Sequence, residues 1–166
     1  MNRPAQTHER PRADDRAMPM SAAALGVAGV LPFILLALAA LFQYDERINL
    51  GAGVARDILV TYGVVIASFL GGVRWGVGLG DLDAKERVAL FSVAVAVPLV
   101  AMAALFVPRP HELSILIALF LLLGVSDVML ANRGIAPRWY GTLRAVLTAI
   151  VVIVLIVALA FLPFDT

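Results

Sequence analysis

Two charged side chains stand alone inside long apolar stretches: Arg74 within residues 58–80 and Asp127 within residues 113–131. A single charge in hydrocarbon is costly, and such groups usually face inward and pair with each other. Counted from the ends of their stretches, at about 1.5 Å of helical rise per residue, the two charges lie at similar depth. We therefore expect an Arg74–Asp127 ion pair. It would be a structural clamp, or part of a proton or ion path or an anion-binding site, unless Arg74 extends separately to the headgroups.

The other residue types with catalytic or metal-binding chemistry do not form a recognisable site. The chain has no cysteine, which excludes disulfides and thiolate ligands, and His8 and His111 lie outside the apolar stretches. Asp81, Asp83 and Glu86 form a small acidic group, but Asp83 and Glu86 have the spacing of a helix-capping box. We expect no catalytic residues, no metal site and no cofactor.

A second pattern within residues 58–80 concerns helix packing. Small residues recur at every fourth position and form what we call the glycine ridge, consisting of Ser68, Gly72, Gly76 and Gly80. Such a ridge lets another helix backbone approach closely. Helical spacing places Gly71, Arg74 and Gly78 on a different face, so this span should be central in the bundle. Packing of the ridge within the chain is the simpler interpretation, and contact with a second copy is the alternative.

The composition indicates the elements that must position these residues. Hydrophobic residues make up 61% of the 166-residue chain and charged residues 15%, with a mean hydropathy of +0.94. Soluble domains contain about 45–50% apolar and about 25% charged residues. Stretches long enough to cross a bilayer as helices, which takes about 20 apolar residues, cover residues 20–42, 58–80, 88–107, 113–131 and 145–163. The sequence predicts an all-α integral membrane bundle with five transmembrane helices (residues 20–166), preceded by a disordered cytoplasmic tail (residues 1–19).

The positive charges predict an orientation with the N-terminus inside and the C-terminus outside, because cytoplasmic loops are enriched in Lys and Arg. Nine lie on the side of the amino terminus, namely Arg3, Arg10, Arg12, Arg16, Lys85, Arg87, Arg133, Arg138 and Arg144, and three on the other side, namely Arg47, Arg56 and Arg109. Trp75, Trp139 and Tyr140 then fall near the cytoplasmic surface, where amphipathic rings are favoured. A net charge of +1 does not suggest a nucleic-acid partner.

One segment resembles the signature of a known family. Ser68-Phe-Leu-Gly-Gly-Val-Arg-Trp-Gly76, preceded by Tyr62-Gly-Val-Val-Ile66, is similar to a motif of the membrane proteins known as domain of unknown function 3429. That family includes transmembrane protein 69 and its bacterial relatives. Gly71, Gly72, Arg74, Trp75 and Gly76 match its motif positions. The resemblance covers roughly residues 22–155 and implies a small multi-span protein of the bacterial cytoplasmic (inner) membrane, with mitochondrial relatives and no assigned activity.

The sequence thus favours a non-enzymatic scaffold or accessory protein. Its partners would be the lipid bilayer and another membrane protein or a second copy of itself. The alternative is a small transporter or channel whose path uses the Arg74–Asp127 pair.

Overall fold

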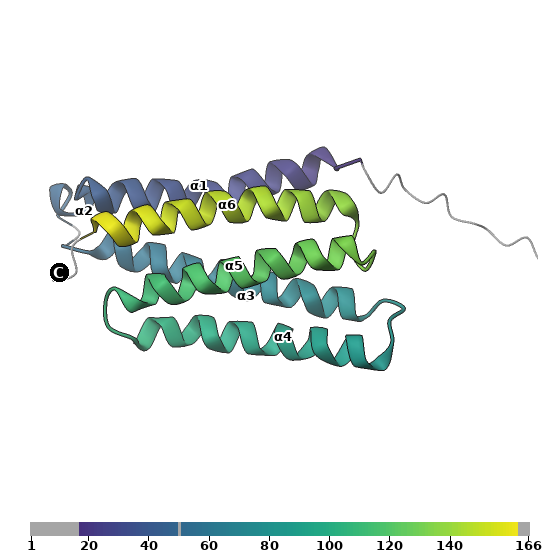
Figure 1. Cartoon of the computed structure of the whole chain (residues 1–166). Coiled ribbons are helices and arrows are strands. Elements are labelled where there is room, and N and C mark those ends of the chain that lie inside the picture. The colour runs from purple at the N-terminus through teal and green to yellow at the C-terminus, as the bar shows by residue number, and fades with distance from the viewer. Residues whose placement is uncertain (1–16, 50, 163–166) are drawn as a thin grey trace, which may run out of the picture.

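The computed structural model describes residues 17–49 and 51–162, so most of the expected tail, residues 1–16, lies outside the described residues. Five long helices make up most of the described chain (Figure 1). They are α1 (Met20–Leu41), α3 (Val54–Gly78), α4 (Ala84–Ala103), α5 (His111–Asn132) and α6 (Arg138–Phe161); α2 (Tyr44–Arg47) and the 3-10 turn η1 (Ala104–Phe106) are short. All five long helices, α4 with its η1 extension, are long and apolar enough to cross a membrane. The predicted all-α, five-span architecture is confirmed.

Three helices begin well before the predicted apolar stretches. Helix α3 begins at Val54 rather than at residue 58, α4 at Ala84 rather than at residue 88, and α6 at Arg138 rather than at residue 145. Arg56 and Arg144, which we expected in the connecting segments, are therefore helical, and both are buried. A hydropathy pattern ends a span at a charge, whereas a helix continues when another helix supplies the counter-charge.

Helix α3 occupies the centre of the bundle, as its low side-chain bulk predicted. It packs against α1, α4 and α5, and α6 packs against α1 and α5 (Figure 1). Helices α1, α3, α5 and α6 thus form a closed group of four, and α4 lies outside this group, mainly against α3. Since α4 reverses the chain between them, α3 and α5 run in the same direction.

Apolar side chains from the four grouped helices fill the centre of the bundle. The Phe33 ring of α1 makes edge-on contacts with the rings of Tyr62 on α3 and Phe120 on α5, at centroid distances of 4.9 and 5.7 Å. The Tyr62 hydroxyl also donates a hydrogen bond to the Gly29 carbonyl oxygen at 2.9 Å. These contacts fix α1 against α3 near the middle of α1.

The close approaches of α3 occur on the face that carries Arg74. A Cβ atom built on Gly71 would lie 2.9 Å from Cβ of Val97 on α4, and one on Gly78 would lie 2.6 Å from the Phe91 ring. These distances are shorter than real Cβ contacts, so a larger residue at either position would force Val97 or Phe91 to shift. The buried charge determines which face of α3 points inward, and the small residues beside it accommodate the neighbouring helix.

The glycine ridge faces outward instead. A Cβ atom on Gly72 or Gly76 would meet no atom within 4 Å, and a Cβ atom on Gly80 would meet only Val77 O of its own chain, at 3.2 Å. All three glycines are exposed, and Gly80 lies beyond the end of α3 at Gly78, so only Ser68, Gly72 and Gly76 of the ridge are helical. The expectation that the ridge packs within the chain was wrong, because the regular spacing of small residues identifies a smooth face without saying which way it points.

Adjacent alanine substitutions separate the two faces of α3. Gly71→Ala should lower the free energy of unfolding by about 1–3 kcal/mol, because the added methyl group is forced against Val97. The matched control, Gly72→Ala, adds the same methyl group in open space and should leave stability unchanged or slightly raised. Denaturation of both variants in detergent micelles measures the difference. Equal loss in both would contradict the packing described for α3.

Candidate functional site

The buried carboxylate of Asp127 on α5 binds two arginines from two other helices. Its Oδ1 lies 2.9 Å from Nη2 of Arg74 on α3, and its Oδ2 accepts a hydrogen bond of 2.7 Å from Nε of Arg144 on α6. The exposed fractions of Arg74, Asp127 and Arg144 are 2%, 1% and 7%. The expected Arg74–Asp127 ion pair is present, and we call the three residues together the ion cluster.

Further hydrogen bonds hold Arg74 against α5. Its Nη2 donates to the Leu123 carbonyl oxygen at 3.1 Å and to the Ser126 hydroxyl, and Ser126 donates in turn to the Leu123 carbonyl oxygen at 2.9 Å. Its Nη1 donates to Leu70 O of its own helix at 3.3 Å. Arg74 therefore does not extend to the membrane surface. Its guanidinium group stays inside the bundle and links α3 to α5.

The ion cluster has one more positive than negative charge, since two guanidinium groups share one carboxylate. Two polar atoms at the cluster lack a partner. Nη2 of Arg144, and Oγ1 of the neighbouring Thr148 one turn further along α6, are buried and make no hydrogen bond. The Tyr140 hydroxyl also interacts with Asp127 but adds no charge. Unpartnered buried donors are unfavourable and uncommon, so they mark a place where a ligand could be accepted.

A second buried ion pair, which the sequence analysis missed, connects the same two helices at their opposite ends. Glu112 Oε1 on α5 accepts hydrogen bonds from Nε and Nη2 of Arg56 on α3, at 3.0 and 2.7 Å. Along α3, Arg56 lies about 27 Å from Arg74 at 1.5 Å per residue, close to the roughly 30 Å thickness of the hydrocarbon core. The sequence did contain a signal for this pair, because Arg56 and Glu112 have opposite charges and precede the apolar stretches of α3 and α5 at the same end of the bundle.

The remaining predicted residues lie apart from the ion cluster or at its edge. Trp75 is exposed and stacks on Phe91 of α4, with ring centroids 4.4 Å apart. Trp139 and Tyr140 lie in the first turn of α6 and contact each other edge-on. All three aromatic residues lie at the end of the bundle where α1 begins, as predicted for an interfacial group, and Tyr140 also reaches Asp127.

The small acidic group at that end acts in capping and pairing. The Asp83 carboxylate accepts a hydrogen bond of 2.7 Å from the Glu86 backbone N–H and so caps α4. Glu86 forms an ion pair with Arg133, which is largely exposed. Across residues 17–49 and 51–162, the structure contains no group of three or more His, Asp or Glu side chains arranged to hold a metal ion.

Five spanning helices whose buried charges are paired across helices define a multi-pass membrane protein. The chain matches, over residues 18–160, the model of the family described as "Protein of unknown function (DUF3429)", and it belongs to that family.

A curated relative supports the same classification. The chain is 32% identical over 144 residues to transmembrane protein 69 of Xenopus tropicalis, an alignment that covers 83% of this chain and 53% of the relative. The chain thus spans about half the length of this relative. No solved structure matches the chain.

Substitution of Asp127 tests the ion cluster. Asp127→Asn should lower the free energy of unfolding by about 3–5 kcal/mol, because it leaves two buried guanidinium groups without a counter-charge. Arg144→Gln should cost less, since a neutral Arg74–Asp127 pair remains. Glu86→Gln is the matched control: its partner Arg133 has a side chain 61% exposed, and loss of such a pair costs at most about 1 kcal/mol. Denaturation in micelles that gave Asp127→Asn and Glu86→Gln the same stability would contradict the role assigned to Asp127.

Proposed function

We propose that this protein is a non-enzymatic accessory protein of the bacterial cytoplasmic membrane that associates laterally through the glycine ridge of α3. The observation that carries the proposal is the open space around Gly72 and Gly76, where a Cβ atom would meet nothing within 4 Å. Glycine in a helix interior is less favourable than alanine by about 1 kcal/mol. Packing within the described chain does not require glycine at these two positions, so a helix outside the chain is the reason we infer for them.

We take a second copy of the chain as the partner. The ridge carries no charge, and its Ser68 hydroxyl already donates a hydrogen bond of 2.8 Å to the Val64 carbonyl oxygen of its own helix. A smooth ridge with a regular four-residue repeat is complementary to itself, as in symmetric helix pairs of the small-xxx-small type. A two-fold arrangement therefore needs no second kind of surface.

The ion cluster favours the clamp interpretation over a proton path. Both oxygens of Asp127 already accept from guanidinium groups, at 2.9 and 2.7 Å. Each oxygen is held by a cationic donor from a different helix, which is the arrangement expected of a structural link. The cluster would then serve to keep α3, α5 and α6 in register, which leaves the outer face of α3 for association.

A small anion transporter is a second candidate, and one observation favours it. A cavity of about 620 Å³ between α4 and α5 is lined by Arg74. At the end of the bundle it reaches two basic residues, Lys85 and Arg133, and two acidic ones, Asp83 and Glu86. Flux of an anion into reconstituted vesicles that is lost in Arg74→Gln, with the fold intact, would favour transport over the accessory role.

Bulky substitutions on the ridge test self-association. The double variant Gly72→Ile and Gly76→Ile should fold normally and lose most self-association in liposomes, because the added side chains hold the two backbones apart. Energy transfer between labelled copies at falling protein-to-lipid ratio measures this. The matched control is Ala145→Ile with Ala149→Ile, which introduces the same side chains at the same spacing on an exposed face of α6.

Three outcomes distinguish the alternatives. Loss of energy transfer in the ridge variant alone supports the proposal, and loss in both variants attributes the effect to bulk in general. A wild-type chain that remains monomeric at every ratio contradicts self-association. In that case, identification of what co-purifies in native lipid, with and without the ridge substitutions, tests a different membrane protein as the partner.

Reporter fusions test the proposed orientation. With the amino terminus in the cytoplasm, a periplasm-dependent reporter such as alkaline phosphatase should be inactive when fused after residue 87 and active when fused after residue 109. These positions lie near the two ends of the α4 segment, Ala84–Phe106. Activity after residue 87 but not after residue 109 would reverse the orientation derived from the positive charges.

A further inference from the structure

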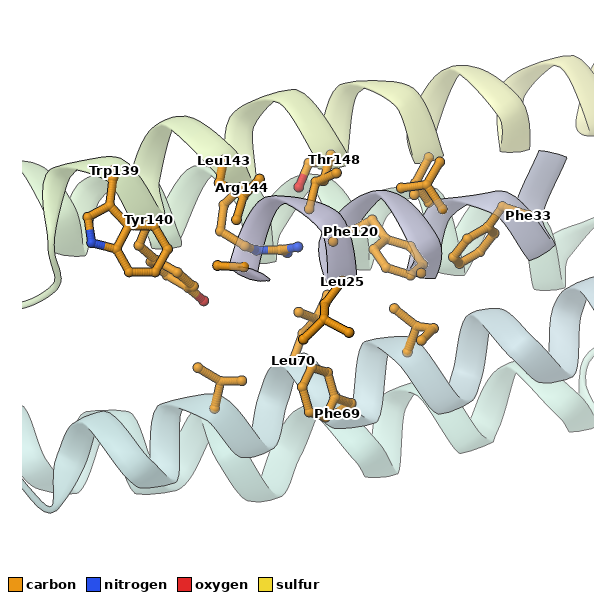
Figure 2. A pocket seen from close by; sticks show the side chains of 18 residues that line it. Leu25, Phe33, Phe69, Leu70, Phe120, Trp139, Tyr140, Leu143, Arg144 and Thr148 are labelled. Carbon is orange, nitrogen blue, oxygen red and sulfur yellow. The ribbon is translucent and has the colours of Figure 1, made fainter. Parts of the chain in front are cut away.

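A cavity of about 410 Å³ lies between α1, α3 and α6, on the other side of the ion cluster from the α4–α5 cavity. Its walls are almost entirely apolar and include Leu25, Gly29, Phe69, Leu70, Leu143 and Leu147. Figure 2 shows α6 along one side of this space and α3 along the other, with Leu25 of α1 between them. The volume falls in the lower part of the range of small-molecule sites, about 300–1,000 Å³.

Arg144 is the only charged side chain in this lining. Its guanidinium group points into the cavity (Figure 2), and the Nη2 atom that Asp127 does not bind is buried without a hydrogen-bond partner. Thr148, whose hydroxyl is also unpartnered, and Tyr140 lie on either side of Arg144 along α6. The cavity therefore combines long apolar walls with one cationic donor that has an unused N–H group.

The cavity opens toward the surroundings of the bundle. Leu25 and Phe69, which line it from α1 and α3, are 74% and 65% exposed. The hydrogen bond from Tyr62 to the Gly29 carbonyl oxygen joins α1 to α3 beside the cavity, whose lining includes Gly29. In a bilayer, this opening faces lipid, because the five helices cross the membrane side by side.

We infer that this cavity binds a long-chain carboxylate that enters from the bilayer. The carboxylate accepts hydrogen bonds from Nη2 of Arg144, and the alkyl chain lies against the apolar walls. The anion also neutralises the excess positive charge of the ion cluster, which a neutral ligand would leave in place. Charge-assisted hydrogen bonds of this type are stronger than neutral ones, and more so in a site without water.

Depth and volume favour a single-chain carboxylate over a phospholipid. Arg144 lies six residues into α6 from Arg138, which is about 9 Å along the helix. A compact carboxylate can descend to that depth with its chain, whereas a phosphodiester carries a polar headgroup and a second chain with it. The proposal does not depend on self-association, because the glycine ridge lies outside this cavity.

Binding of palmitate to the full chain in phosphatidylcholine nanodiscs tests the inference. Native mass spectrometry and titration with radiolabelled palmitate should show one molecule per chain. Arg144→Gln should weaken binding by about tenfold or more, because it removes the charge-assisted hydrogen bond, and palmitic acid methyl ester should bind the wild type as weakly. Denaturation verifies that Arg144→Gln remains folded.

A second variant fills the cavity without touching the ion cluster. Gly29 lines the cavity and has no atom within 4 Å of its Cβ position, so Gly29→Leu should place bulk where the chain lies and abolish palmitate binding. Ala149→Leu, on an exposed position outside the lining, is the control and should bind as the wild type does.

Equal binding of palmitate and its methyl ester, or full binding by Gly29→Leu, would overturn the inference. Displacement of bound palmitate by phosphatidylglycerol at near-stoichiometric amounts would overturn the assignment to a single-chain carboxylate and identify an anionic phospholipid as the ligand. Absence of binding at concentrations of palmitate that saturate the bilayer would overturn the lipid site altogether.

Discussion

The fold depends on one constraint, which is that a charge inside a bilayer needs a counter-charge from another helix. Asp127 satisfies this constraint for three helices at once, because its two oxygens bind Arg74 of α3 and Arg144 of α6. The Arg56–Glu112 pair does the same for α3 and α5 at their other ends. Two parallel helices fixed at both ends cannot slide or rotate without breaking a buried ion pair. The ion pairs thus determine the register of the helices, and the apolar side chains pack between helices held in that register.

The sequence predicted only those buried charges that interrupt an apolar stretch. Arg74 and Asp127 are charges inside otherwise uncharged stretches, so their depths could be compared and their pairing predicted. Arg144, Arg56 and Glu112 lie where an apolar stretch gives way to polar residues, and a charge there is indistinguishable from the end of a span. Their burial follows from the positions of neighbouring helices, which no local pattern contains.

The glycines of α3 show the same limit in a different way. The four-residue ridge and the face containing Gly71 and Gly78 are both low in bulk, and spacing alone does not rank them. The position of Arg74 distinguishes the two faces. Because Arg74 must point toward Asp127, the face of α3 that carries Arg74 is turned toward the interior of the bundle. The outward direction of Gly72 and Gly76 is thus a consequence of the ion cluster rather than an independent feature.

The order of the charged residues along the chain also bears on how the protein is made. Arg74 leaves the ribosome before Asp127 and Arg144 have been synthesised, so α3 reaches the membrane with the charge of Arg74 still uncompensated. An arginine at the centre of a helix opposes insertion by about 2.5–3.5 kcal/mol, and one nearer the end, as Arg74 is in Val54–Gly78, opposes it by less. The apolar residues of α3 must outweigh that penalty, or α3 must wait beside the insertion machinery until α5 arrives. The three-helix link through Asp127 therefore forms only when α6, which is translated after α5, reaches the other two helices.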